Sequence, residues 1–402
     1  VMAMSFYPKE ARPLWDTYST RAIAHTIDVY NRFAITYPYP TAQSVNGPVG
    51  GMEYPMITFN GPRPVRGDDG RLTYTERAKN GLIGVVIHEV GHTYFPMIIN
   101  SDERQWTWMD EGLNSFLQYE AQKLWDPDFP SRGEPRDIVE YMISQDQVPV
   151  MTQSDSLLQF GNNAYAKPAT ALVILRETVL GRELFDRAFR EYSARWAFKR
   201  PTPYDFFRTM EESSGVDLDW FWRGWFYSTD HVDISLDGVT AARLAPADPE
   251  ARARADRERF AGEPVPTTVT GNRGMETVIE RDPAVRDFYN ETDRFTVTAA
   301  QRREAATAAA RADADRRAAQ GFDDNIYRLT FTNVGGLVMP VILKLTYSDG
   351  SDETIRIPAE IWRRNSRQVV WQHVSSKTLT GAEIDPLWET ADADRANNAY
   401  PR

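Results

Sequence analysis

The segment His88-Glu89-Val90-Gly91-His92 places two metal-binding side chains four residues apart. In an α-helix, residues i and i+4 lie on one face, one turn apart, so both imidazole rings can reach a single ion. Zinc accepts nitrogen and carboxylate oxygen ligands, and a catalytic zinc site keeps one position for water. Glu89 adjoins the first histidine, where a carboxylate can act as general base toward that water. The motif therefore predicts a hydrolytic zinc site with His88 and His92 as ligands and Glu89 as base.

A third ligand is expected from a second helix that begins near Trp108. Eighteen residues lie between His92 and Glu111, and Glu111 on this helix would let the metal join the two helices. Ser115 follows Glu111 by one helical turn, where it could support a ligand by a hydrogen bond. The alternative is a pair of core histidines without a metal. The chain has only five histidines, and this alternative does not explain Glu111.

Two further segments, residues 50–54 (GGMEY) and residues 163–167 (NAYAK), make the pattern more specific. The order and spacing of all four blocks resemble the gluzincin metallopeptidases, and within them the zinc aminopeptidases of the aminopeptidase N and leukotriene hydrolase type. Residues 50–54 (GGMEY) are similar to that family's Gly-x-Met-Glu-Asn exopeptidase motif. Residues 163–167 (NAYAK) resemble the Tyr-Glu-Lys-Gly-Ala block that carries the catalytic tyrosine. The resemblance covers about residues 35–228.

The resemblance implies a zinc-dependent aminopeptidase that acts on peptides with a free amino terminus. Tyr165 would then donate a hydrogen bond to the oxyanion, and Glu53 would bind the α-ammonium of the substrate, with Gly51 and Met52 beside it. Tyr54 stands where the family usually has asparagine. Two alternatives stay open: a zinc endopeptidase or oligopeptidase if Glu53 does not face the metal, and a non-catalytic binding homologue.

Composition limits the choice of partners and the size of the fold. A length of 402 residues argues for two or more domains, and 42% hydrophobic residues allow a sizeable core. The net charge of −11 argues against nucleic acid or an anionic membrane as the main partner. No apolar run approaches the roughly 18 residues of a membrane span. The absence of cysteine excludes disulfides and thiolate ligands but leaves the compartment open.

The elements that must position these residues indicate an α+β fold. Helices are expected at 20–37, 75–94 and 108–124, and a strand at the rim of the cleft over 47–59. The apolar run that leads into the first histidine predicts a buried metal-binding helix. We therefore predict a thermolysin-like, mostly helical zinc-peptidase catalytic domain over residues 1–230.

The rest of the chain has a different character. Residues 231–325 are expected to contain a first strand and then a charged helical insertion or linker, because 247–260 and 298–320 lack a sustained apolar stripe. Residues 326–402 alternate between apolar and polar side chains around a turn at 348–351. This pattern predicts a small β-sandwich at the carboxyl end.

Only 49 residues precede Gly50, whereas the resembling family places a β-rich domain before this motif. In that family the domain covers the cleft and contributes to the first side-chain pocket. We therefore expect the sequence to be a truncated or processed form without that domain.

Overall fold

The structure is a computed structural model, and it describes residues 1–243, 248–311 and 325–401. It combines helices with β-sheets, which confirms the mixed α and β composition predicted from the sequence. Within these described ranges, none of the helices has both the length and the apolar character needed to cross a membrane.

A four-stranded sheet lies near the amino end and contains the rim of the metal site. Its strand order is β1 (Met2–Phe6), β2 (Thr41–Asn46), β4 (Ile57–Asn60) and β3 (Gly51–Tyr54). Strands β1, β2 and β4 are parallel, whereas β3 runs antiparallel to β4 at the edge. The single strand predicted over 47–59 was therefore wrong. The chain reverses because Pro55 presets φ for the turn and Met56 adopts a φ of 67°.

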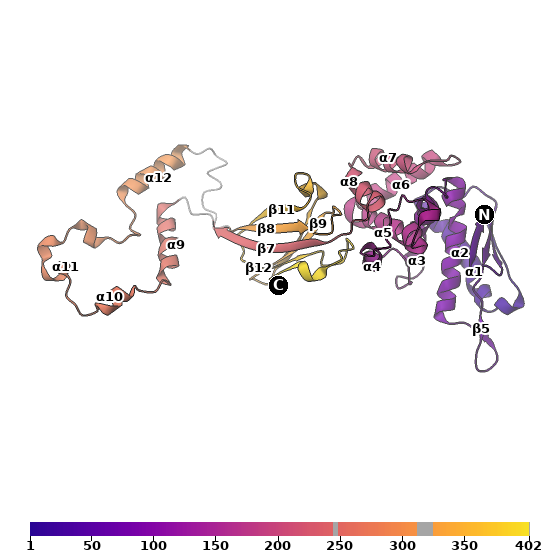
Figure 1. Cartoon of the computed structure of the whole chain (residues 1–402), viewed down its shortest axis with the longest axis horizontal. Helices are drawn as coiled ribbons and strands as arrows, with labels where there is room; N and C mark the ends of the chain where they lie inside the picture. Colours follow the sequence, from indigo (N-terminus) through magenta and orange to yellow (C-terminus); the bar gives the residue numbers. More distant parts are fainter. Residues whose placement is uncertain (244–247, 312–324, 402) are drawn as a thin grey trace.

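Two long helices, α1 (Leu14–Phe33) and α2 (Glu76–Gly91), pack beside this sheet (Figure 1). Helix α2 begins where predicted, because the Thr75 side chain accepts a hydrogen bond from the Ala78 amide at 3.1 Å. It ends just before a π-helical turn, η2 (Thr93–Ile98). The apolar run that leads into the motif is buried as expected, and four of its side chains are fully inaccessible: Leu82, Ile83, Val86 and Ile87.

Further helices complete this part of the chain. Glu111 lies on a π-helical turn, η3 (Trp108–Gly112), that continues directly into α3 (Leu113–Trp125). Tyr165 lies on a similar turn, η6 (Gly161–Ala166), before α5 (Lys167–Ile174). Further helical segments are α4 (Val139–Met142), η7 (Leu175–Val179), α6 (Arg182–Trp196), α7 (Pro203–Ser214), α8 (Asp219–Trp222) and η8 (Arg223–Tyr227), together with the short 3₁₀ turns η1 (Lys9–Ala11), η4 (Pro135–Ile138) and η5 (Ser154–Ser156). A two-stranded hairpin precedes α2, with strands β5 (Val65–Arg66) and β6 (Leu72–Thr73).

Two antiparallel sheets follow the helical part. One has the order β11 (Gln368–Ser375), β8 (Asn325–Asn333) and β7 (Ile234–Arg243). The other has the order β10 (Asp352–Ile357), β9 (Val341–Tyr347), β12 (Leu379–Ile384) and β13 (Ala399–Tyr400). Alternate side chains such as Leu329, Phe331, Leu343 and Leu345 are fully buried. The strands predicted after residue 326 are therefore present in the structure.

A largely exposed group of helices connects β7 to β8. It comprises α9 (Pro249–Ala261), α10 (Thr267–Gly271), α11 (Val278–Arg281) and α12 (Ala299–Arg311). In Figure 1 these helices lie beyond the two sheets, away from α2. Residues 247–260 and 298–320 were expected to be a helical insertion or a linker; the structure has α9 and α12 there, and residues 247 and 312–320 lie outside the described ranges.

Candidate active site

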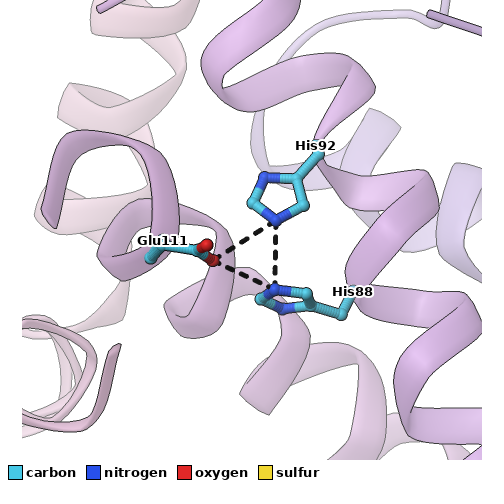
Figure 2. A group of neighbouring side chains, drawn as sticks. All are labelled: His88, His92 and Glu111. Carbon is cyan, nitrogen blue, oxygen red and sulfur yellow. Dashed lines mark hydrogen bonds and ion pairs between the residues drawn. The ribbon is translucent and has the colours of Figure 1, made fainter. Parts of the chain in front are cut away.

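The three predicted metal ligands converge on one point (Figure 2). His88 Nε2 lies 3.1 Å from Glu111 Oε2, and His92 Nε2 lies 3.3 Å from the same oxygen. The two Nε2 atoms are 3.0 Å apart. In a tetrahedral zinc site with bonds of about 2.1 Å, ligand atoms lie roughly 3.4 Å from one another. The spacing of the donor atoms and their chemical types therefore fit zinc.

Neighbouring groups fix the orientation of both imidazole rings. His92 Nδ1 lies 2.9 Å from the Phe95 carbonyl oxygen and 3.0 Å from Asp110 Oδ1. His88 Nδ1 lies 3.0 Å from Gln118 Oε1. Contacts of this kind set the ring tautomer and leave Nε2 to face the metal. Asp110 was not predicted from the sequence, although its place directly before Glu111 was a usable signal.

Ser115 does not provide the support that was expected of it. Its hydroxyl is buried and has no hydrogen-bond partner within the described part of the chain. Instead, Asn114 Nδ2 donates to the His88 carbonyl oxygen at 2.9 Å, and Gln118 contacts the same histidine. Asn114 and Gln118 follow Glu111 by three and seven residues, so they share its helix face. The helical spacing of these two polar residues after Glu111 was therefore the sequence signal that could have identified Asn114 and Gln118.

Glu89 is a buried carboxylate with a free acceptor atom. Its side chain is only 5% exposed, and its Oε2 has no hydrogen-bond partner among the residues described. Burial raises the pKa of Glu89 to about 8; the charge of His92 opposes this rise, and the nearby Glu53 and Glu111 carboxylates reinforce it. A cation held by the neighbouring ligands would favour the ionised form of Glu89, and in that form the unused lone pair of Oε2 is suited to take a proton from water.

The pKa of Glu111 is shifted in the opposite direction, downward. Its burial disfavours the charged form, but hydrogen bonds from His88 and His92 and their charges outweigh this effect. They hold the pKa of the Glu111 carboxyl below its usual range. Glu111 is therefore ionised at neutral pH, as a metal ligand must be.

Strand β3 lies directly against the catalytic end of α2. A Cβ atom at Gly51 would lie 2.1 Å from Glu89 Oε1 and 2.8 Å from Val85 Cγ2. Only glycine allows the strand backbone to approach this closely without moving a side chain. Gly51 therefore determines how much room the Glu89 carboxylate has.

Glu53 lies on the same face of β3, because residues two apart in a strand share a face. One of its carboxylate oxygens lies within 4.8 Å of ligand atoms of His92 and Asp110. Met52 and Tyr54 alternate to the other face and are exposed. The endopeptidase alternative was favoured if Glu53 did not face the metal, whereas in the structure the Glu53 carboxylate lies near the metal ligand His92.

Tyr165 completes the group. Its hydroxyl donates to Glu111 Oε1 at 2.6 Å, and its ring stacks on the His88 ring with centroids 5.7 Å apart. Burial raises the pKa of Tyr165, and the negative charge of Glu111 raises it further. The phenol therefore stays protonated and can act as a hydrogen-bond donor at neutral pH.

A groove of about 1170 Å³ opens from these residues. His88, Glu89, Gly51 and Tyr165 line it at the metal centre. From there it follows α2 toward the amino end of the helix, as far as Glu76. The size and position of the groove suit an extended peptide segment better than a single small molecule.

Two histidines and a glutamate around one metal position, with a buried free carboxylate beside them, define a metal-dependent hydrolase. A model of the Peptidase family M1 domain matches residues 18–225, just over half of the chain. The chain therefore belongs to peptidase family M1. This membership agrees with the predicted peptidase class, and the three converging ligand atoms are of the types that fit zinc.

The chain matches only part of the length of each similar protein. A probable aminopeptidase 1 from Sulfurisphaera tokodaii is 24% identical over 239 residues, which are 53% of this chain and 29% of the relative. Glutamyl aminopeptidase from Bos taurus is 23% identical over 252 residues, 57% of this chain and 25% of the relative. The chain thus spans about a quarter of the length of these relatives.

One solved structure shares the fold over nearly the whole chain. It is the aminopeptidase A of Legionella pneumophila in complex with aspartic acid, with a TM-score of 0.59 and 12% sequence identity. The similarity covers 97% of this chain and 36% of that one. At this level of identity the likeness concerns the fold alone.

Proposed function

We propose that the protein removes the amino-terminal residue from peptides, as a zinc aminopeptidase. One observation carries this proposal: the Glu53 carboxylate lies beside His92 and Asp110 at the metal centre. A fixed negative charge there attracts the α-ammonium of a peptide and places the first carbonyl at the metal. The aminopeptidase names of the relatives support the same reaction. The presence of Glu89 and all three ligands argues against a non-catalytic homologue.

His88, His92 and Glu111 would hold the zinc ion. When bound, zinc polarises a substrate carbonyl and lowers the pKa of water toward about 7. Glu89 accepts a proton from the attacking water and returns it to the leaving amine. Tyr165, whose hydroxyl donates to Glu111 in the structure, transfers this hydrogen bond to the substrate carbonyl oxygen as negative charge develops there.

Strand β3 would hold the peptide backbone. It is an edge strand, paired only with β4 within the described sheet, so its free edge can pair with an extended peptide. Gly51 and Met52 would contact the first residues of the substrate, and Glu53 would mark the point where the chain begins.

We also propose a division of the chain into domains. We assign residues 1–230 to a thermolysin-like catalytic domain and 231–325 to a strand with a helical insertion. Residues 326–402 form the proposed carboxy-terminal β-sandwich. Because β7 pairs with β8 in one sheet, expression of residues 1–230 and 231–402 as two segments, followed by thermal unfolding, would test whether each one folds as a unit.

Replacement of Glu53 by alanine tests the aminopeptidase assignment. Alanine p-nitroanilide with a free amine should lose roughly ten- to a hundredfold in kcat/KM, mainly through KM, because a charge-assisted contact to the ammonium is lost. Loss of alignment at the scissile carbonyl should also lower kcat. Glu10→Ala, which removes an exposed carboxylate outside the site, is the control and should behave like the wild type.

The comparison of free and acetylated substrates gives the decisive outcome. The wild type should strongly prefer the free amine, and Glu53→Ala should lose that preference. Equal cleavage of both substrates by the wild type would refute the aminopeptidase assignment in favour of an endopeptidase.

Replacement of Gly51 by alanine should lower kcat roughly ten- to a hundredfold, because the added methyl group displaces the Glu89 carboxylate. Gly50→Ala is a matched control, since a Cβ at Gly50 meets nothing within 4 Å. The melting temperature should change little in Gly50→Ala, whereas any decrease in Gly51→Ala would report on Val85, whose Cγ2 would lie 2.8 Å from the added Cβ. Equal kcat values for the two variants would show that this close approach is not required.

A further inference from the structure

The groove leads away from the metal centre along α2. Glu53 lies near His92, whereas the groove is lined by His88 and then by residues that precede it on α2, as far as Glu76. The helix rises about 18 Å between Glu76 and His88, a length of roughly five extended residues. A peptide whose amine is at Glu53 therefore sends its remaining residues along this groove.

Arg132 supplies a positive charge in the groove close to the metal centre. Its guanidinium carbon lies 5.7 Å from the centroid of the Tyr165 ring, and both residues line the groove. Nearby cations are already paired: Lys123 contacts Glu134 at 3.0 Å, and Arg136 contacts Asp137 at 3.7 Å. The Arg132 side chain is exposed and forms no ion pair with another described residue. Its charge is therefore available to a ligand.

The loop that carries Arg132 is attached to α3. Gly133 has a φ of 129°, and a Cβ atom there would lie 2.8 Å from Cδ2 of Tyr119. The Tyr119 hydroxyl donates to Glu134 Oε1 at 3.2 Å, and Lys123 donates to the Phe129 carbonyl oxygen at 3.2 Å. These contacts lie on both sides of Arg132 and hold its backbone beside the groove.

The charge around the metal makes this cation significant. Glu53 and the ionised Glu111 lie at the metal centre, so a substrate carboxylate close to the scissile bond would meet negative charge. The planar guanidinium of arginine matches a carboxylate with two parallel hydrogen bonds. Arg132 is the cation nearest to Tyr165 in the described groove, and it can offset this repulsion.

We propose that Arg132 binds a carboxylate on the leaving side of the substrate, one or two residues after the scissile bond. The inference rests on the proposed aminopeptidase function and names its substrate class. Two extended residues span roughly 7 Å. This length is comparable to the 5.7 Å between the Arg132 guanidinium carbon and the centroid of the Tyr165 ring beside the metal centre. The carboxylate is either the free carboxyl terminus of a di- or tripeptide or an acidic side chain in a longer peptide.

Two matched substrate pairs test this proposal on the zinc-loaded full chain. The first pair is Ala-Ala-Ala with a free or an amidated carboxyl terminus. The second pair is amidated Ala-Asp-Ala and amidated Ala-Asn-Ala. In the wild type, kcat/KM should be roughly ten- to a hundredfold higher for the charged member of at least one pair, mainly through KM. The pair that responds identifies the source of the carboxylate.

Variants assign the effect to Arg132. The ratio within the responding pair should fall to about one in Arg132→Gln, and Arg132→Lys should restore part of it because the charge returns without the planar fork. Arg136→Gln, which removes an arginine outside the groove, should keep the wild-type ratio. Arg77→Gln removes the other arginine that lines the groove, near the amino end of α2, and should also keep it.

Three outcomes would overturn the inference: equal cleavage within both pairs by the wild type, a ratio unchanged in Arg132→Gln, or a ratio lost in Arg77→Gln instead. The proposed function fails in a distinguishable way. Alanine p-nitroanilide has no carboxylate in its leaving group, so a wild type that cannot cleave it would refute the aminopeptidase assignment itself.

Discussion

Replacement of Glu89 by glutamine is expected to reduce turnover by at least about a hundredfold while zinc stays bound. Glutamine keeps the shape of the side chain, but its amide cannot accept a proton at neutral pH. The buried Oε2 of Glu89 has no hydrogen-bond partner within the described chain, so no other interaction of that atom is lost with the charge. Glu89 lies outside the group His88, His92 and Glu111, whose atoms converge on the metal position.

Metal content and turnover have to be measured on the same samples. After dialysis, Glu89→Gln should contain as much zinc per chain as the wild type, whereas His92→Ala should lose both zinc and activity. His92 is the matched comparison because its Nε2 lies 3.3 Å from Glu111 Oε2. Wild-type turnover in Glu89→Gln would show that another group activates the water. Undiminished zinc in His92→Ala would refute the ligand assignment.

The parts of the site that follow from local spacing could be predicted. His88 and His92 are one helical turn apart, and the apolar run before them required a buried helix, which α2 provides. Glu111 follows in a second helical segment, and its carboxylate reaches both rings. Alternation of apolar and polar residues likewise predicted the strands after residue 326.

Other features depend on contacts between distant segments, which spacing does not encode. Arg132 and Tyr165 come together because a loop after α3 folds over η6, and no pattern in either segment indicates this. The hairpin of β3 and β4 was missed because Pro55 and Met56 form a turn that interrupts what read as one strand. Met56 adopts a positive φ without being glycine, so its conformation had no sequence signal.

Replacement of Tyr165 by phenylalanine removes one hydroxyl and keeps the ring that stacks on His88. We expect kcat to fall by roughly two to three orders of magnitude with little change in KM. A donor that acts only when negative charge develops on the carbonyl oxygen stabilises the transition state and not the bound substrate. In the structure this hydroxyl donates to Glu111 Oε1 at 2.6 Å, so it lies within reach of the metal centre.

The same hydrogen bond makes a second measurement necessary, because its loss could weaken zinc binding through Glu111. The zinc content of Tyr165→Phe should equal that of the wild type, which would place the loss of activity in the reaction itself. Tyr192→Phe is the matched control, since it removes a fully buried hydroxyl that has no partner among the described residues. Its kcat should stay at the wild-type value. An unchanged kcat in Tyr165→Phe would leave this tyrosine a packing residue beside His88, and the oxyanion would need another donor.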